Sequence, residues 1–219
     1  QSSATSATKI QSYYTDMIIN DVIEDLQETY DLSESAATTM IYQSGLRIYS
    51  AEDEQMQSIC EEVYLNGASM PKDQKLQSGI IVMDYQGRVL ATVGRRGEKT
   101  QNRAWNNAID AVRQPGSAIK PISVYSYAVE NNIVDWSTLI EDEPIELNGQ
   151  KWPRNVYGYY RGPIPTQKAL EISSNACAAQ LALLNGMENS FYFMRDKMHI
   201  STAVEELIID GKNYTDINL

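Results

Sequence analysis

A serine and a lysine three residues apart form the pair in this chain whose side chains could do chemistry. Ser117 and Lys120 lie in the run R-Q-P-G-S-A-I-K-P, residues 113–121. On a helix this spacing places two side chains on one face, close enough to touch. A serine hydroxyl becomes a useful nucleophile when a nearby base accepts its proton, and a lysine amine is such a base when burial keeps it partly neutral. The pair therefore predicts acyl transfer through a serine ester.

The residues around this pair indicate how it is positioned. Pro115-Gly116 predicts a turn into a helix that begins near Ser117. Pro121 agrees, because the missing N–H of proline costs little only in the first turn. Free N–H groups and the helix dipole at that end stabilise the negative charge of a developing oxyanion. We expect the helix to reach about residue 131. Its expected inward-facing residues are Ile122, Tyr125, Ser126 and Val129.

The spacing alone is weak evidence, since a solvated helix face explains most serines and lysines three residues apart. The surrounding run, however, resembles the active-site segment of class A, bifunctional penicillin-binding proteins, and S-x-x-K is a signature of such proteins and of class A β-lactamases. Asn102-Arg103-Ala104 is similar to the family's lead-in to this segment. Residues 45–57 resemble its strand-then-helix entry to the transpeptidase domain. The helix before them resembles the connector after a glycosyltransferase domain, which favours class A.

A second stretch resembles the S-x-N motif of the same family. Residues 169–175, A-L-E-I-S-S-N, would lie on a helix that begins at Thr166 and runs to about Leu184, with Gly186 as its stop. By themselves, polar residues inside an apolar helix face solvent or bond to nearby carbonyls. The resemblance implies that Ser173 relays a proton between Lys120 and the leaving amine, and that Asn175 holds Lys120 and the substrate backbone.

Three further residues are predicted to contact substrate: Ser174, Trp152 and Tyr157. W-P-R-N at 152–155 and Y-R-G at 160–162 resemble the family's segment between its two motifs. Tyr157, Tyr159 and Tyr160 form an aromatic group that could line a substrate groove or cover the edge of the core. Residues 135–165 as a whole are expected to be irregular, as in a long functional loop.

The third motif of the family, K-T-G or K-S-G, does not occur in the sequence. Lys99-Thr100-Gln101 and Lys212-Asn213 do not match it. In the family, that strand supplies an oxyanion N–H and grips the substrate carboxylate, and loss of one oxyanion donor costs roughly 10²–10³ in rate. We therefore expect residues 45–219 to be the N-terminal portion of a transpeptidase domain and residues 1–44 to be a linker and connector helix from an upstream glycosyltransferase domain. The chain alone is expected to be inactive or nearly so.

The fold expected from these patterns is α+β, a partial penicillin-binding-protein/β-lactamase-like transpeptidase fold with an incomplete antiparallel sheet. A tail or linker at 1–8 precedes a helix from Ser12. A short strand follows at 46–48, then a helix that opens with a Ser50/Asp53 capping box and ends near Asn66-Gly67. Strands at 79–83 and 88–93 form a hairpin through the turn at 84–87. Residues 95–112 are expected to be a loop or short helix, 187–200 amphipathic, and 205–219 an acidic loop.

Composition restricts the alternatives. The net charge of −11 argues against nucleic acid as a partner, since phosphate binding needs a basic face. No apolar run approaches the roughly 18 residues of a membrane span. The single histidine, His199, argues against a Ser-His-Asp triad and is expected to be structural. Cys60 and Cys177 have no metal-ligand spacing, and we expect them to be unbridged apolar residues. No metal or cofactor is implied.

The resemblance implies a D,D-transpeptidase that cross-links the D-Ala-D-Ala stem peptides of peptidoglycan and is acylated by β-lactam antibiotics. It would act on the extracytoplasmic face of a bacterial plasma membrane, with its anchor upstream of this chain. A β-lactam sensor or β-lactamase-like serine hydrolase is one alternative, and a non-catalytic scaffold or interaction module is another. The unfinished sheet edge also predicts self-association.

Overall fold

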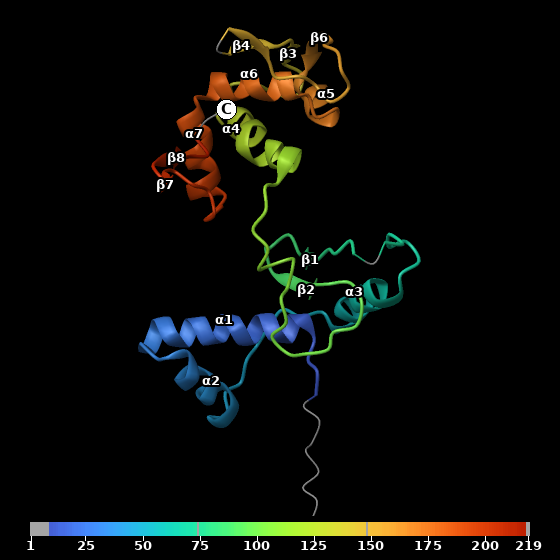
Figure 1. The fold of residues 1–219 in the computed structure, drawn as a ribbon, viewed down its shortest axis with the longest axis vertical. Helices are drawn as coiled ribbons and strands as arrows, with labels where there is room; N and C mark the ends of the chain where they lie inside the picture. The colour runs from blue at the N-terminus through green and yellow to red at the C-terminus, as the bar shows by residue number, and fades with distance from the viewer. Residues whose placement is uncertain (1–8, 74, 148, 218–219) are drawn as a thin grey trace, which may run out of the picture. The chain divides into compact units, whose positions relative to one another are not determined.

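The computed structural model describes residues 9–73, 75–147 and 149–217. The chain divides into two compact units, Gln1–Ala111 and Val112–Leu219, each with its own elements (Figure 1). Residues 1–8, predicted to be a tail or linker, lie outside the described residues. The mixture of helices and small antiparallel sheets confirms the expected α+β class.

The first unit begins with two packed helices. Helix α1, Tyr13–Tyr30, starts where predicted, because the Ser12 hydroxyl accepts the N–H of Thr15 at 2.9 Å. Helix α2, Glu34–Gln43, was not predicted, although Ser33 is a capping residue of the same kind. The two helices share a small apolar cluster made of Ile19, Ile23, Leu26 and Ala37.

A helix and a hairpin complete the first unit. Helix α3, Glu54–Asn66, lies against strand β2, and β1, Ile80–Met83, pairs antiparallel with β2, Val89–Val93. The predicted hairpin is thus confirmed. The Gln57 side chain connects α3 to the sheet, because its amide donates to the Thr92 carbonyl at 3.0 Å and accepts the Thr92 N–H at 2.9 Å. Residues 95–112 form a loop, as one of the two predicted forms.

Two local predictions in this unit are wrong. Residues 46–48 form no strand, and Leu46 and Ile48 are exposed. A strand requires a partner for its backbone groups, and this segment has none among the described residues. Helix α3 begins at Glu54 rather than near Ser50, because the Asp53 carboxylate caps it by accepting the N–H of Met56 at 2.9 Å.

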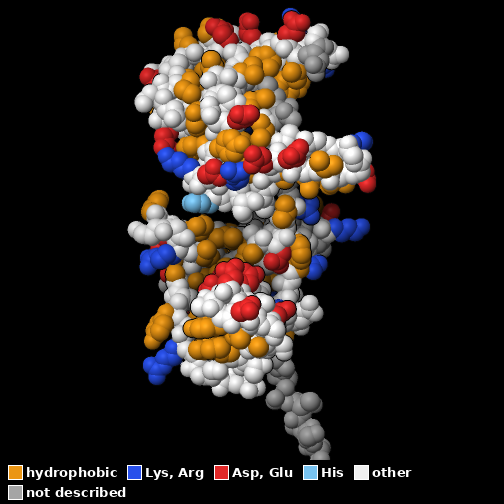
Figure 2. Space-filling model, turned by 90° about the vertical axis from the view of Figure 1, so that its left-hand side faces the viewer, with side chains coloured by type: hydrophobic (Ala, Val, Ile, Leu, Met, Phe, Trp, Pro, Cys, Tyr) orange, Lys and Arg blue, Asp and Glu red, His pale blue; other side chains and the backbone are white. Residues whose placement is uncertain are grey.

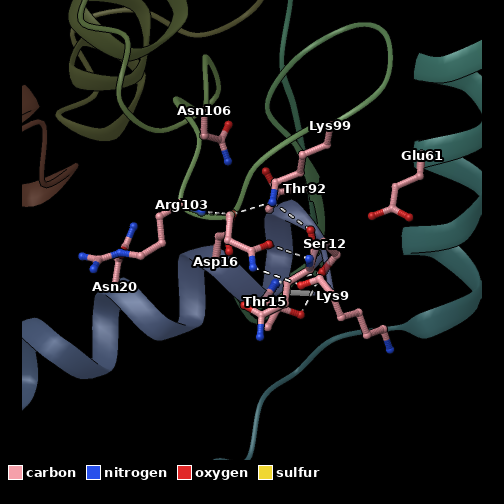
Figure 3. Close-up of polar contacts among 12 residues, drawn as sticks. Lys9, Ser12, Thr15, Asp16, Asn20, Glu61, Thr92, Lys99, Arg103 and Asn106 are labelled. Atoms are coloured by element: carbon pink, nitrogen blue, oxygen red, sulfur yellow. Dashed lines mark hydrogen bonds and ion pairs between the residues drawn. The ribbon is translucent and has the colours of Figure 1, made fainter. Parts of the chain in front are cut away.

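A buried carboxylate attaches α1 to the loop after β2. Asp16 points from α1 toward the segment that carries Lys99 and Arg103 (Figure 3). Its carboxylate lies 2.7 Å from the Lys99 amine and accepts the Arg103 N–H at 2.7 Å. Asp16 is only 3% exposed, so this ion pair is largely shielded from water. Asn102 adds a contact by accepting the Gln11 N–H at 2.7 Å.

The second unit opens with an irregular helical segment. A 3₁₀ turn, η1, spans Gly116–Ile119, a π turn, η2, spans Pro121–Tyr125, and helix α4 spans Ser126–Glu130. The predicted extent is confirmed, but the inward positions differ: Val124, Tyr125 and Ala128 are buried, whereas Ile122, Ser126 and Val129 are half-buried. A π turn contains more residues than an α turn, so the positions that face the core differ from those of a regular α-helix.

The expectation of an irregular segment over 135–165 is wrong. Strand β3, Leu139–Asp142, pairs antiparallel with β6, Gly162–Pro165, and β4, Ile145–Leu147, pairs with β5, Gln150–Trp152. The sequence held a signal for the second pair, since Asn-Gly between two short runs is typical of a two-residue hairpin turn. The four strands are short, and alternation over three or four residues is hard to recognise.

Helices and a hairpin form the rest of this unit. The single helix predicted over 166–184 is wrong, because α5, Thr166–Glu171, and α6, Asn175–Asn185, are separated by a corner at residues 172–174. Helix α7, Met187–Tyr192, continues into the π turn η3, Phe193–Lys197. The predicted acidic loop also contains strands β7, Leu207–Ile209, and β8, Lys212–Tyr214, joined by Asp210-Gly211.

The core of the second unit lies between α6, the segment at 116–130 and strand β3. Helix α6 runs beneath the β3–β6 strands in Figure 1 and contributes the small side chains that allow this approach. Cys177 is fully buried in this core and is free, as is the half-buried Cys60 of the first unit. The core residues are Val124, Tyr125, Ala128, Val134, Ile140, Ala169, Cys177, Ala178, Leu181 and Ala182.

Candidate active site

The Lys120 amine lies at the centre of the candidate site. The residue stands between η1 and η2 and is half-buried. Its Nζ donates to the Asn175 Oδ1 at 2.5 Å, to the Ser173 carbonyl at 2.8 Å and to the Ser173 Oγ at 3.2 Å. Burial lowers the pKa of Lys120 below the ordinary value of 10.5, and the neighbouring Cys177 offsets this only in part. The environment thus favours the neutral amine that a general base requires.

The corner between α5 and α6 brings Ser173 and Asn175 to this lysine. Ser173 adopts a left-handed backbone conformation with φ of 56°, and its N–H bonds to the Leu170 carbonyl at 3.0 Å. The next residue, Ser174, caps α6 by accepting the N–H of Cys177 at 3.0 Å. Serine and asparagine favour caps over helix interiors because their side chains compete for backbone groups. The Ser-Ser-Asn run therefore interrupts the helix, which continuous helical periodicity does not predict.

A buried carboxylate supports the corner from behind. Asp142, at the end of β3, is fully buried. It accepts hydrogen bonds from the Ser174 hydroxyl at 2.6 Å, the Asn155 amide at 2.8 Å, the Tyr157 hydroxyl at 2.8 Å and the Arg161 N–H at 3.1 Å. Burial alone raises the pKa of Asp142, but these four bonds outweigh it and lower the pKa below the ordinary 3.8. The group is therefore a carboxylate at neutral pH.

Asn155 links this carboxylate to the start of α6. Its side-chain oxygen accepts the Asn175 N–H at 2.9 Å and the Ala176 N–H at 3.2 Å. Its amide nitrogen donates to Asp142 and to the Tyr159 carbonyl. Asn155 thereby binds two helix N–H groups that have no partner within α6. Sequence reasoning placed both Asp142 and Asn155 within an irregular stretch and assigned neither a role of its own.

Asn175 is held from two sides. Its Oδ1 accepts from Lys120, and its Nδ2 donates to the Arg154 carbonyl at 2.8 Å. These two contacts fix which side of the amide faces the lysine, since only the oxygen can accept from an ammonium or amine N–H. The contact with Lys120 is the geometry that the S-x-N resemblance implies for Asn175.

Ser117 is exposed on η1. Among the described residues, no hydrogen bond joins its hydroxyl to Lys120, although the Lys120 N–H bonds to the Ser117 carbonyl. The change from a 3₁₀ to a π turn alters the side-chain stacking expected of a regular helix, and the Lys120 amine is engaged by the corner. Catalytic hydrogen bonds are often long without substrate and tighten in the complex.

An open cavity of about 1170 Å³ borders the site. Lys120, Asn175 and Trp152 line it, as does Gly116, the residue before Ser117. Apolar side chains among its other lining residues include Ile119, Ala178, Met187, Phe191, Met194 and Ile200. The predicted substrate contact of Trp152 is compatible with this position.

Two of the predicted substrate-binding residues have internal partners. Ser174 is fully buried, and its hydroxyl is occupied by Asp142 and the Cys177 N–H. The half-buried Tyr157 also directs its hydroxyl to Asp142, and its ring packs edge-on against Tyr159 at 5.0 Å between centroids. These contacts argue against direct substrate binding by either residue and favour the role of core edge for this aromatic group.

The surface drawn in Figure 2, His199 and the described ranges bear on the expectations from composition. On the face drawn in Figure 2, acidic, basic and apolar side chains are interspersed, and that face shows no continuous basic area among the described residues. His199 is exposed and adopts a left-handed conformation. Within the described ranges, no helix has the length and apolar character to cross a bilayer, and no acidic, histidine and cysteine side chains group as metal ligands do.

Comparison with known proteins identifies the family. The family model described as the penicillin binding protein transpeptidase domain matches residues 78–208. Penicillin-binding protein 1A of Clostridium perfringens is 30% identical over 203 residues, which cover 83% of this chain and 29% of that protein. Penicillin-binding protein 1F of Bacillus subtilis is 28% identical over 182 residues, covering 82% of this chain and 24% of that protein.

Solved structures agree with this comparison at the level of the fold. The protein PonA1 of Mycobacterium tuberculosis, solved in complex with penicillin V, has a TM-score of 0.66 and 22% sequence identity. The match covers 90% of this chain and 51% of that one. The chain belongs to the penicillin-binding protein transpeptidase family, and its relatives are of class A, as the sequence resemblance indicated. It spans between a quarter and a third of the length of the C. perfringens relative.

Proposed function

We propose that this chain carries the nucleophile half of a peptidoglycan D,D-transpeptidase site. The observation that carries the proposal is the Lys120 amine, whose pKa is lowered by burial and which bonds to both Ser173 and Asn175. Ser173 and Asn175 belong to the S-x-N motif and lie 53 and 55 positions after the lysine of the S-x-x-K motif. A base, a hydroxyl relay and an amide within hydrogen-bond distance are the parts that serine acyl transfer needs.

The reaction follows from these parts. Lys120 accepts the Ser117 proton while the Ser117 Oγ bonds to the carbonyl carbon of the penultimate D-alanine. The resulting tetrahedral adduct collapses, the bond to the terminal D-alanine breaks, and its nitrogen receives the proton through Ser173. An amine of a neighbouring stem peptide then attacks the ester, forms the cross-link and returns the proton to Ser117. A β-lactam carbonyl reacts at the same hydroxyl, but its leaving nitrogen stays attached.

The family and the cavity support this assignment of substrate and inhibitor. Trp152 at the border of the cavity is proposed to contact the peptide, and the strand with the K-T-G motif is proposed to come from sequence outside this chain. Residues 1–44 are proposed as the connector from a glycosyltransferase domain, and residues 45–219 as the N-terminal portion of the transpeptidase domain. The complete protein would act at the extracytoplasmic face of a bacterial membrane. The chain alone would be inactive or nearly so and would associate through its sheet edges.

Labelling with fluorescent penicillin tests the proposal on the full-length protein. The wild type is expected to form a covalent adduct, and Ser117→Ala is expected to form none. Ser126→Ala is the matched control, because the Ser126 hydroxyl donates only to the Pro121 carbonyl and should leave labelling unchanged. Covalent labelling of the Ser117→Ala variant would disprove the assignment of the nucleophile.

The same assay separates the two alternatives. A β-lactamase-like hydrolase would release the penicillin in a rapid deacylation step, whereas a transpeptidase keeps a long-lived adduct. A non-catalytic scaffold would fold and bind its partners without any covalent labelling. Sedimentation of the isolated chain tests the edge association: a monomer that acylates as fast as the complete domain would contradict both statements about the chain alone.

A further inference from the structure

The corner that presents Ser173 and Asn175 is held by side chains outside the two sequence motifs. Helix α5 contributes backbone hydrogen bonds to it, through the carbonyls of Lys168, Ala169 and Leu170. The side-chain contacts come instead from strand β3 and from the loop after β5, which contribute Asp142 and Asn155. These two residues stand 32 and 20 positions away in sequence from the groups they hold.

Two paths connect the carboxylate to Lys120, one partly along the backbone and the other through hydrogen bonds between side chains and one backbone N–H. In the first, the Asp142 Oδ1 accepts from the Ser174 hydroxyl at 2.6 Å, and Ser174 is joined through the backbone to Ser173, whose carbonyl and hydroxyl accept from Lys120. In the second, the same oxygen accepts from Asn155 at 2.8 Å, Asn155 accepts the Asn175 N–H at 2.9 Å, and Asn175 accepts from Lys120 at 2.5 Å. Both sides of the corner are thus fixed to one fully buried group.

The chemistry of this centre requires a carboxylate. Five donors converge on Asp142, counting the Cys177 thiol at 3.9 Å, and an ionised carboxylate is the side chain that accepts several hydrogen bonds without donating one. Hydrogen bonds to an ionised acceptor are also shorter and stronger than neutral ones. An asparagine in its place would direct an N–H₂ group at one pair of these donors, so part of the network would lose its acceptor.

Among the described residues, no cationic side chain neutralises the charge of the buried Asp142 carboxylate. Within the described part of the chain, no lysine or arginine forms an ion pair with Asp142, and Arg161 contacts it through the backbone N–H. The Arg161 guanidinium instead lies over the rings of Tyr157 and Tyr159, 5.4 and 4.9 Å from their centroids. Burial of a charge is costly unless hydrogen bonds compensate it, so a well-packed apolar residue would serve stability as well. Geometry at the corner is the property that such a residue could not supply.

We propose that Asp142 is a positioning residue for acylation: through Ser174 and Asn155, it fixes the corner that presents Ser173 and Asn175 to Lys120. This inference rests on the proposed function. It adds to the site two residues, Asp142 and Asn155, that belong to neither motif and touch neither the lysine nor the cavity. Their effect should fall on the rate of the covalent step and leave the initial binding of the lactam nearly unchanged.

The test measures acylation of the full-length protein by fluorescent penicillin in stopped flow, which separates the dissociation constant of the initial complex from the acylation rate constant. For Asp142→Asn, we expect the rate constant to fall by about 10- to 100-fold, because a displacement near 1 Å costs about 10²-fold. The dissociation constant should change by less than about threefold. The folded fraction is measured at the same temperature, and rates are expressed per folded molecule.

Thr166→Val is the matched control for loss of a buried hydrogen bond in the same unit. The fully buried Thr166 donates to the Thr138 carbonyl at 3.0 Å, and that carbonyl keeps the Thr166 N–H at 2.8 Å. This variant should acylate at the wild-type rate. Ser174→Ala is the milder second variant: it removes one of the two paths and should reduce the rate constant by a smaller factor with little change in binding.

The outcomes are distinct. A wild-type protein that is not labelled at Ser117 would refute the proposed function itself. If the wild type is labelled, equal per-molecule rates for Asp142→Asn and Thr166→Val would overturn the positioning role. A loss that appears in the dissociation constant alone would also overturn it. If Asp142→Asn does not fold, Ser174→Ala decides, and a wild-type rate constant in that variant would refute the inference.

Discussion

Replacement of Lys120 by arginine separates the two roles that a lysine can have in this site. A lysine can act as a base that accepts the serine proton or as a fixed cation that orders Ser173 and Asn175. Arginine preserves the charge and has five N–H donors, enough to replace the three hydrogen bonds that Lys120 makes at 2.5, 2.8 and 3.2 Å. It cannot lose its proton in a protein, so it preserves the cation and removes the base.

The expected effect of Lys120→Arg is therefore large and specific to the covalent step. A positioned general base contributes about 10²- to 10⁴-fold, which corresponds to about 2.7–5.5 kcal/mol in the activation free energy. The loss should appear in the acylation rate constant for penicillin, measured on full-length protein, with less change in the initial dissociation constant. Lys168→Arg on α5 is the control. Among the described residues, the Lys168 amine pairs with Glu171 alone, at 2.8 Å, so this substitution should leave acylation unchanged.

The pH dependence provides a second measurement on the same variant. The wild-type acylation rate should rise with pH as the Lys120 amine loses its proton and become constant at higher pH. Because burial lowers the pKa of Lys120, the inflection of this rise should lie below pH 10.5. Titration of Cys177 should not contribute to this rise, because burial raises the pKa of its thiol to about 11. Lys120→Arg should lack the rise. Acylation of that variant within about threefold of the wild type, with the pH limb intact, would refute the role of Lys120 as base.

Three further predictions concern stability and are measured by thermal or denaturant unfolding of the full-length protein. Hydrogen bonds lower the pKa of Asp142 in the folded protein below 3.8, so its contribution to the free energy of unfolding is present above pH 3.8 and is lost as the pH falls through the folded-state pKa. Asp142→Asn should therefore reduce the loss of stability on acidification in this pH range. Lys99→Met should cost about 3 kcal/mol or more, since it leaves the buried Asp16 carboxylate without its cation; a loss under about 1 kcal/mol would contradict this. Gly94→Ala should lower the free energy of unfolding by about 1–3 kcal/mol, because the new Cβ would lie 2.6 Å from the Asn106 Cα. An unchanged stability would show that the loop containing Asn106 moves aside without cost.

Local signals were reliable where a short stretch of sequence contains its own partner. Helix α1 begins at its capping residue Ser12, and the β1–β2 hairpin closes through the turn at 84–87. In that turn, the Asp84 carboxylate accepts the N–H groups of Gln86 and Arg88, both at 2.9 Å. Such contacts lie within four residues, so residue type and spacing are enough to predict them.

Prediction failed where distant groups decided the outcome. The strand expected at 46–48 has the right alternation but no partner strand, and the strands over 139–165 have partners that their short sequences do not reveal. The helix expected to run through Ser173 is interrupted because Ser174 prefers to cap α6 and to donate to Asp142. In each case, tertiary partners outweighed local periodicity.

The sequence by itself determined the family, the pair Ser117 and Lys120, and the presence of a second motif at 173–175, because these depend on residue types at fixed spacing. Only the tertiary structure decided that the second motif lies on a corner against Lys120, and that a buried carboxylate holds that corner in place. Asp142 lies 32 residues before Ser174, and no local pattern relates the two. Packing between α6 and β3 brings them within 2.6 Å, where burial makes their hydrogen bond hard to replace with water.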